Sequence, residues 1–292
     1  INLLNHHVLL FCNNVLEKHI TKISRKNLIK QSYEFIEKNK YLNKYEDKKL
    51  YQHQKMLFSA VKSQGAKLLL YQAPTGMGKT LSPIGLSKHK KIIFVCAAKH
   101  VGMQLAKSCI SMEIPIAIAF GCLDASDIRL HYYAAKDFVK NRKTGGIFRV
   151  DNSVGDKVEI IISDVKSYLC SMNYMLAFNK AEDIVWFWDE PTITLDYTEH
   201  PFHNILKNNW KQNTIPNVIL SSATLPKQNE IYGCISSFRS KFPMSSIQEI
   251  TSYECKKTIP ILDVKGHIVL PHLIFENYED VKKCVNYLNN NK

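Results

Sequence analysis

The chain alternates short apolar runs with longer segments in which apolar residues recur at helical spacing. Continuous apolar runs with polar flanks are typical of strands that are buried on both faces of a sheet. Strands that alternate with helices predict a mostly parallel sheet with helices on both faces. The runs that predict strands are residues 67–72, 92–97, 115–120, 158–162, 184–188 and 217–220.

Two amphipathic segments flank the first of these strands. The segment before it predicts a helix that ends at Gly65, and the residues on its buried face are Met56, Leu57, Ala60 and Val61. The segment after it predicts a helix that begins at about Gly78, and the residues facing the core are Leu81, Ile84 and Leu86.

The pattern also divides the chain into three parts. Residues 1–47 are polar, basic and helix-prone, which predicts a helical N-terminal extension on a main domain of residues 48–250. Within that domain, residues 121–157 break the alternation and are interpreted as an insertion. We expect a basic helix over 127–143, then a hairpin opened at Gly145-Gly146 with a turn at 153–156. Residues 251–292 predict a second hairpin, around 263–266, and a short helix over 279–288.

The first predicted strand leads directly into Ala73-Pro74-Thr75-Gly76-Met77-Gly78-Lys79-Thr80. Gly76 and Gly78 permit backbone angles that let main-chain N–H groups close on an anion, and a helix N-terminus adds partial positive charge there. In such a P-loop Lys79 reaches the β- and γ-phosphates of a nucleotide and the Thr80 hydroxyl binds Mg²⁺. The general pattern has Gly where this chain has Ala73. The alternative is a Gly-rich turn that ends by chance in Gly-Lys-Thr.

Polar residues follow two of the other predicted strands, at the same edge of the predicted sheet as the P-loop. Asp189-Glu190 comes after the fifth strand, and Ser222-Ala223-Thr224 lies at the end of the sixth. Ligands of parallel sheets bind beyond the carboxyl ends of the strands. Asp189 is therefore predicted to contact Mg²⁺, and Glu190 to polarise an attacking water. The alternative is an ordinary helix cap, since Pro191 favours a turn there.

A glutamine ahead of the P-loop is a candidate for recognising the base of the nucleotide. A side-chain amide can pair with both the donor and the acceptor edge of adenine. Gln54 is the candidate, with Gln52 second. The alternative is a glutamine at a helix start that faces water.

Composition narrows the choice of partner. The 292 residues carry a net charge of +13, from 39 Lys and Arg against 26 Asp and Glu. Such a charge favours polyanions, nucleic acid above all, although the chain is also generally rich in Lys, Asn and Ile. Its eight cysteines form no Cys-x-x-Cys pair, which indicates neither a zinc site nor a disulfide framework and favours a reducing, intracellular compartment. No apolar run reaches the length needed to span a bilayer, so we expect no membrane partner.

Taken together and in this order, the P-loop, Asp189-Glu190-Pro191-Thr192 and Ser222-Ala223-Thr224-Leu225-Pro226 resemble motifs I, II and III of superfamily-two helicases. Leu50-x-x-His53-Gln54 resembles the family's adenine-reading Gln motif, and residues 98–100 and 163–166 resemble motifs Ia and Ib. The resemblance covers about residues 48–250 and implies the first of two RecA-like motor domains. Motif II reads Asp-Glu-Pro-Thr rather than Asp-Glu-Ala-Asp, so the DEAD-box subfamily is not assigned. The Asn- and Lys-rich composition resembles that of helicases from large DNA viruses.

The resemblance implies a role for each matching residue. ATP and Mg²⁺ would be bound by Pro74, Thr75, Gly76, Met77, Gly78, Lys79, Thr80 and Asp189, with Glu190 completing the hydrolytic site. Ser222, Ala223 and Thr224 would couple the nucleotide to single-stranded RNA or DNA. The strand's backbone would contact Lys99, His100, Gln104, Ser163 and Lys166, although a solvated lysine is an equally ordinary reading of Lys99 and Lys166.

The resemblance also implies a second motor domain beyond residue 292, because no Gln-x-x-Gly-Arg-x-x-Arg run is present here. That domain supplies arginine fingers, so we expect these residues alone to bind ATP and hydrolyse it slowly. Two other functions remain open at this point: a P-loop phosphotransferase acting on a small molecule, and a non-catalytic nucleic-acid-binding scaffold derived from a helicase.

Overall fold

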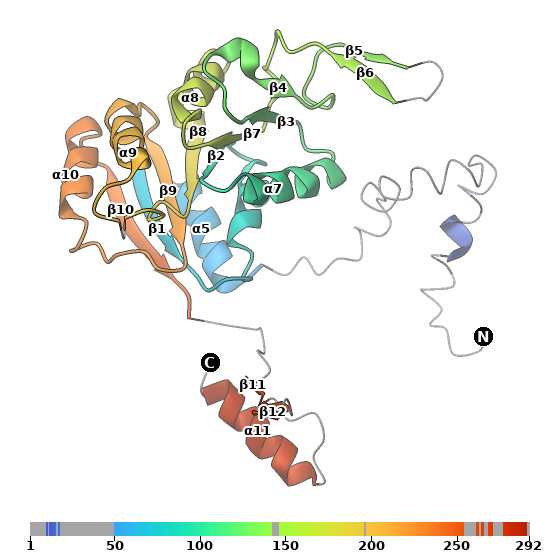
Figure 1. The fold of residues 1–292 in the computed structure, drawn as a ribbon, viewed down its shortest axis with the longest axis vertical. Coiled ribbons are helices and arrows are strands. Elements are labelled where there is room, and N and C mark those ends of the chain that lie inside the picture. The colour runs from blue at the N-terminus through green and yellow to red at the C-terminus, as the bar shows by residue number, and fades with distance from the viewer. Residues whose placement is uncertain are drawn as a thin grey trace.

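The computed structural model describes residues 10, 12–15, 17, 50–141, 146–195, 197–253, 261–262, 264–265, 268–270 and 277–290. Its largest sheet has eight strands: β1 (Lys67–Gln72), β2 (Lys91–Cys96), β3 (Ile116–Ala119), β4 (Arg129–Leu130), β7 (Ile160–Asp164), β8 (Ile184–Asp189), β9 (Asn217–Ser222) and β10 (Ser246–Thr251). The order across the sheet is β10-β1-β9-β8-β2-β7-β3-β4 (Figure 1). Every neighbouring pair is parallel except β3 and β4, which run antiparallel.

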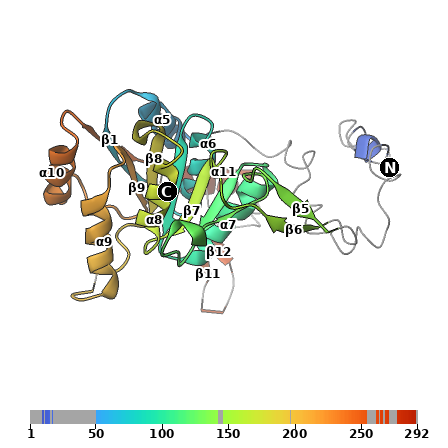
Figure 2. The same ribbon diagram turned by 90° about the horizontal axis from the view of Figure 1, so that it is seen from above.

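Helices cover both faces of this sheet, as Figures 1 and 2 show. One face carries α5 (Gln52–Lys62), α6 (Ser82–Leu86) and α7 (Lys99–Ser111), and the other carries α8 (Tyr168–Leu176), α9 (Pro201–Gln212) and α10 (Tyr232–Lys241). Because side chains alternate along a strand, Leu69 and Tyr71 of β1 pack toward α5 and α6, whereas Leu68 and Leu70 pack toward the opposite helices. The predicted architecture, a mostly parallel sheet between two helical layers, is confirmed.

The start of β1 fixes the direction of α5. Lys67 is fully buried, and its ammonium donates to the carbonyl oxygens of Ala60, Val61 and Ser63 at the end of that helix. A cation at a helix C-terminus satisfies carbonyls that have no partner within the helix and interacts favourably with the helix dipole. Burial, and then the charge of Lys90, lower the pKa of Lys67. This contact holds α5 along β1, with the start of the helix beside the far end of the strand.

All six strands expected from the sequence are present, but several local expectations are wrong. β7 begins and ends two residues later than the run at 158–162. The helix after the P-loop begins as a 3-10 turn over Lys79–Leu81, and Leu81 is 48% exposed instead of facing the core. Met56 of α5 is also exposed. A seventh parallel strand, β10, was not expected.

The insertion differs most from expectation. Of the helix expected over 127–143, none forms in the described residues 127–141: the chain makes a 3-10 turn over Ala125–Asp127, then β4, then β5 (Phe138–Lys140). The carboxylate of Asp124 accepts the N–H of Ser126, which caps that single turn, and the chain then pairs with β3. β6 (Ile147–Val150) pairs with β5 before it, not across residues 153–156 with the strand after it.

The ends of the chain are described only in part. Nearly all of the extension predicted for residues 1–47 lies outside the described residues. Toward the other end, β11 (Ile261–Leu262) and β12 (Ile268–Leu270) form the expected antiparallel hairpin, and α11 (Tyr278–Asn290) is the expected helix. No helix within the described part of the chain has both the length and the apolar character needed to cross a bilayer.

Two helical glycines test how tightly the layers pack. A Cβ at Gly102 of α7 would lie 2.7 Å from the ring of Phe120 and 2.9 Å from Ile162, whereas one at Gly233 of α10 has nothing within 4 Å. We expect Gly102→Ala to lower the free energy of unfolding by about 1–3 kcal/mol. The matched change Gly233→Ala should be neutral or stabilising by less than about 1 kcal/mol. Urea denaturation of both variants checks this, and equal stabilities would contradict it.

Candidate active site

The P-loop joins β1 to the 3-10 turn that begins at Lys79. Gly76 and Gly78 adopt left-handed backbone conformations, with φ of 81° and 75°. A Cβ at Gly78 would also lie 2.9 Å from the side-chain nitrogen of Gln54, so this position combines an unusual backbone with close packing. Only glycine adopts this conformation without strain. The loop thus has the geometry in which backbone N–H groups can surround an anion.

Lys79 lies at the centre of the site and is buried. Its ammonium donates to the carbonyl of Ala73, the first residue of the loop. Burial lowers the pKa of Lys79, and the neighbouring carboxylates of Glu190 and Asp189 oppose that shift. The P-loop lysine and the two acids therefore belong to one electrostatic site.

Asp189 is the last residue of β8 and is only 5% exposed. Burial, and then repulsion from Glu190, raise the pKa of Asp189 from 3.8 to about 6. The hydroxyl of Ser221 donates to one carboxylate oxygen of Asp189 at 3.3 Å. A buried carboxylate that is costly to ionise is a position at which a cation is strongly favoured. The carboxylate of Asp189 and the hydroxyl of Thr80 are hard oxygen ligands of the kind that Mg²⁺ prefers, so these residues fit that ion.

Glu190 has a backbone conformation that non-glycine residues seldom adopt, with φ of 51°. Its N–H donates to the carbonyl of Ser221 at 2.7 Å, and its carboxylate accepts the hydroxyl of Ser222 at 2.5 Å. Conformations of this kind persist where surrounding contacts hold them, and they concentrate at functional sites. The turn directs the Glu190 carboxylate away from the path of β8 and toward the end of β9.

The ends of three strands are tied together by side chains. Ser222 at the end of β9 bonds Glu190 after β8, and its hydroxyl also accepts the N–H of Thr224 at 3.1 Å. The side chain of Gln72, the last residue of β1, donates to the carbonyl of Ala223 at 3.1 Å. Sequence reasoning missed Gln72. Its position directly before the P-loop was the available signal, but a polar residue ending a strand is too common to be specific.

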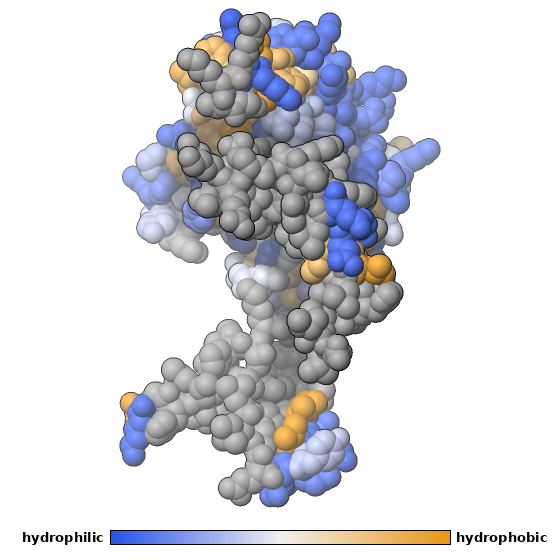
Figure 3. All heavy atoms as spheres, turned by 90° about the vertical axis from the view of Figure 1, so that its right-hand side faces the viewer, coloured by the Kyte–Doolittle hydropathy of each residue, from blue (hydrophilic) through white to orange (hydrophobic). Residues whose placement is uncertain are grey.

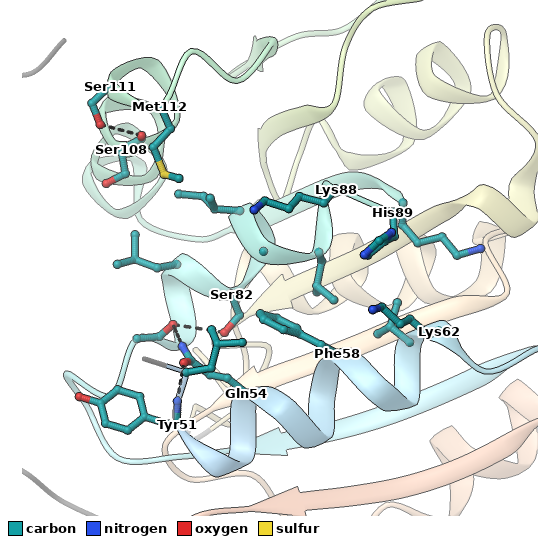
Figure 4. Close-up of a pocket in the computed structure, with 18 residues that line it drawn as sticks. Tyr51, Gln54, Phe58, Lys62, Ser82, Lys88, His89, Ser108, Ser111 and Met112 are labelled. Carbon is teal, nitrogen blue, oxygen red and sulfur yellow. Dashed lines mark hydrogen bonds between the residues drawn. The ribbon is translucent and has the colours of Figure 1, made fainter. Parts of the chain in front are cut away.

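A cavity of about 580 Å³ opens beside the P-loop between α5, α6 and the C-terminal end of α7 (Figure 4). Gln54 lies at its P-loop end, where its side-chain oxygen accepts the N–H of Tyr51 at 3.1 Å and its nitrogen donates to the carbonyl of Gly78 at 3.3 Å. One N–H and one lone pair of the Gln54 amide remain for a ligand. Tyr51 and Phe58 line the same cavity. Its size and apolar lining suit a planar organic group, and the phosphate cradle lies directly beside it.

A buried chain of hydrogen bonds from α5, β1 and α6 reaches the carbonyl of Gly78 in the P-loop. Nδ1 of His53 lies 2.7 Å from the hydroxyl of Tyr71, which lies 3.4 Å from the hydroxyl of Ser82. Ser82 in turn donates to the carbonyl of Gly78 at 3.2 Å. Burial raises the pKa of Tyr71 to about 12, so the phenol keeps its proton. The carbonyl of Gly78 is therefore held by Gln54 and Ser82 together. Sequence reasoning gave no role to Tyr71 or Ser82.

Most residues predicted to contact nucleic acid lie exposed beyond the strand ends. Lys99, His100 and Gln104 are exposed on the first turns of α7, and Lys166 is exposed after β7. The ammonium of Lys99 lies 5.7 Å from the ring centre of Phe120, and that of Lys166 lies 5.7 Å from the ring centre of Phe202.

Ser163 does not share this exposure. It is completely buried within β7, donates to the carbonyl of Asp164 and receives the hydroxyl of Ser171 at 3.0 Å. A side chain so enclosed cannot reach a ligand, so the contact predicted for Ser163 does not fit the structure. The exposed part of that segment is fastened instead by Asp164, whose carboxylate accepts the N–H groups of Gly121 and Ser167 at 2.7 and 2.8 Å.

No protein-family model matches the sequence, and no curated protein matches it. Solved structures show a distant likeness. An ATP-dependent RNA helicase from Sulfolobus tokodaii, described as hypothetical, has 14% identity and a TM-score of 0.42 over 78% of this chain and 57% of its own. A DEAD box protein from Methanococcus jannaschii has 15% identity and a TM-score of 0.43 over 78% and 54%.

A third, the DEAD-box helicase Mss116 bound to single-stranded RNA and UDP-BeF, has 13% identity and a TM-score of 0.45 over 82% and 45%. The matched region of this chain thus spans about half the length of the structures it resembles. Likenesses at these identities and TM-scores are too distant to assign a family, so function has to be argued from the residues of this chain.

The raised pKa of Asp189 predicts how the free energy of unfolding depends on pH. Because the pKa is higher in the folded chain, the protonated form is favoured there, and the stability it contributes is lost as pH rises from about 4 to about 6. In the absence of nucleotide and Mg²⁺, we expect Asp189→Asn to be more stable than wild type at pH 8 by up to about 3 kcal/mol. The difference should shrink toward pH 4. Urea denaturation across this pH range measures it, with exposed Asp156→Asn as the control. A difference independent of pH would contradict the expectation.

Proposed function

We propose that this chain is the ATP-binding motor domain of an ATP-dependent nucleic-acid helicase or translocase. The observation that carries the proposal is the convergence of Lys79, Asp189 and Glu190 in one buried site, beyond the carboxyl ends of β1 and β8. Hydrolysis of a nucleotide needs a phosphate cradle, a metal-binding carboxylate and a group that orients water, and these three residues supply them in a single place.

In this proposal the residues act in sequence on one nucleotide. The base enters the cavity beside Gln54, and the phosphates lie against the N–H groups of residues 75–78 with Lys79. Thr80 and Asp189 would hold Mg²⁺, which neutralises charge on the phosphate oxygens when it is bound. Glu190 accepts a proton from the water that attacks the γ-phosphate. The bond from Ser222 keeps the Glu190 carboxylate pointed across the site.

The same bonds provide a route from the nucleotide to the nucleic acid. A change at the γ-phosphate alters the environment of Glu190, and hence of Ser222, and Gln72 links the following residue, Ala223, back to the strand that carries the P-loop. Residues 222–224 are therefore bonded both to Glu190 and to the strand that leads into the P-loop. Lys99, His100, Gln104 and Lys166 contact the phosphate backbone of a single strand, RNA or DNA. Such contacts position a strand without reading its sequence.

The proposal includes a second RecA-like domain beyond residue 292, which closes on the exposed edge of this site. Arginine fingers contribute about 10³- to 10⁵-fold to nucleotide hydrolysis. With the present residues alone, we expect ATP to bind but to be hydrolysed only slowly.

The central experiment uses the full-length protein and compares wild type, Glu190→Gln and Lys79→Ala in ATP binding and in ATP turnover, with and without single strands. Glu190→Gln should keep the ATP affinity and lose turnover by about 10²- to 10⁴-fold, because only the proton acceptor is removed. Lys79→Ala should lose binding. Turnover that ignores single strands would point to a phosphotransferase, and ATP binding without turnover in the full-length protein would point to a scaffold. Either result overturns the proposal.

Ser222→Ala tests the coupling. The variant should still bind ATP, but the factor by which single strands stimulate turnover should fall by roughly fivefold or more. Ser240→Ala, a change on the exposed side of α10, is the matched control. Unchanged stimulation in Ser222→Ala would remove residues 222–224 from the coupling route while leaving the nucleotide site intact.

A further inference from the structure

The insertion ends in a two-stranded ribbon that projects past β4 at the edge of the sheet (Figure 1). We call residues 131–141 and 146–151 the β5–β6 arm. Aromatic rings gather along its base: those of His131, Tyr132 and Tyr133 lie with centres 4.4–4.6 Å apart, and that of Phe138 lies 5.3 Å from Tyr132. Two-stranded ribbons are only marginally stable by themselves, and this cluster anchors the arm.

Beyond its base the arm exposes apolar side chains. Phe148 is 75% exposed, Val139 55% and Phe138 40%. Large apolar residues concentrated on a projecting element are typical of a surface that binds a ligand or another macromolecule. They contribute little to the folded core, because they touch little of it.

The two faces of the arm differ. Val150 pairs with Phe138 across the ribbon, and the register then shifts so that Ile147 and Phe148 together oppose Lys140 in a bulge, which places Phe148 across from Lys140. The ammonium of Lys140 lies 5.8 Å from the ring centre of Phe138, on the same face as that ring. Val139 pairs with Arg149 on the reverse face. In Figure 3, which looks onto this side of the molecule, hydrophobic surface adjoins strongly hydrophilic surface at the top, where the arm projects.

The charges on the arm favour an anion as its partner. Lys136, Lys140 and Arg149 are all exposed along it. Of the two acids, Asp137 lies next to Lys136, and Asp151 is engaged with the N–H of Ser153 at the base. Exposed rings interleaved with cations suit a partner that has both flat apolar groups and phosphates. Single-stranded nucleic acid has this combination, because unpaired bases stack on rings while phosphates meet cations.

The connection of the arm to the sheet separates it from the nucleotide. β4 runs antiparallel to β3, and the N–H of His131 donates to the carbonyl of Ile116 at 2.9 Å, so the chain leaves the sheet beside the start of β3. The P-loop, Asp189 and Glu190 follow the ends of their strands. A ligand on the arm is therefore held by a part of the fold that the ATP site does not contact.

We propose that the face of the β5–β6 arm carrying Phe138, Lys140 and Phe148 binds single-stranded nucleic acid independently of ATP. Bases stack on the two phenylalanines, and Lys140 contacts the backbone. The arm thereby keeps hold of a strand while the contacts at the ATP site open and close. The proposal rests on the proposed function only for the class of partner.

The test is the affinity of the whole chain for a fluorescently labelled single strand, measured without nucleotide. Phe148→Ala should weaken binding roughly 5- to 100-fold, as expected for the loss of one stacked base. Lys140→Ala should reduce the slope of log affinity against log salt by about 1. Val139→Ala, which changes an exposed apolar residue on the reverse face, is the matched control and should bind like wild type.

Other outcomes overturn the inference. Equal affinities of wild type and Phe148→Ala would remove the arm from nucleic-acid binding. Equal losses of nucleic-acid affinity in Phe148→Ala and Val139→Ala would show that binding is not confined to the face that carries Phe138 and Lys140. Self-association that Phe148→Ala abolishes, with nucleic-acid affinity unchanged, would make the arm a protein interface. Lys79→Ala separates the two proposals: it should lose ATP binding and keep the effect of Phe148→Ala, so either proposal can fail while the other stands.

Discussion

The structure depends on keeping opposite charges close together where water is largely excluded. Asp189 and Glu190 are adjacent, and their mutual repulsion and burial make ionisation of Asp189 costly. Lys79 is the cation that faces them, and it is itself buried at a cost. This arrangement requires each strand end to be fixed in place. A small displacement would admit water, and water would weaken the attraction between Lys79 and the two acids. The parallel sheet supplies that fixity, since β1, β9 and β8 end side by side in register.

The supports around this cluster come from both helical layers and from the sheet itself. On one side, Gln54 of α5 and Ser82 of α6 bond the same carbonyl of Gly78. On the other, Ser221 and Ser222 of β9 bond the two acids, and Gln72 bonds the residue that follows them. The loop is thus positioned by polar contacts from elements far apart in the sequence. Functional side chains held in this way lose less freedom when a ligand arrives.

The sequence predicted the elements whose signals are local and strong, and missed those decided by tertiary contacts. Six buried strands were visible because runs such as Ile92–Cys96 and Ile184–Trp188 are apolar without interruption. β10 was not visible, because an edge strand with exposed Gln248 and Glu249 reads as irregular chain. The stretch from 127 to 143 was expected to be helical, yet its residues Arg129–Leu130 pair with β3, and Ile128 and Leu130 are buried there. At the site, the spacing of motifs located Lys79, Asp189 and Glu190. It could not reveal that Ser163 faces inward or that Tyr71 supports the loop, because neither follows from neighbouring residues.

The bond between Lys79 and the carbonyl of Ala73 has a consequence for what the loop can bind. A buried ammonium with no acceptor would draw in solvent or distort the loop around it. The carbonyl of Ala73 is that acceptor here. Under the proposed function, a nucleotide would offer Lys79 a more highly charged acceptor in exchange, whereas a ligand of small charge would gain little from displacing the carbonyl.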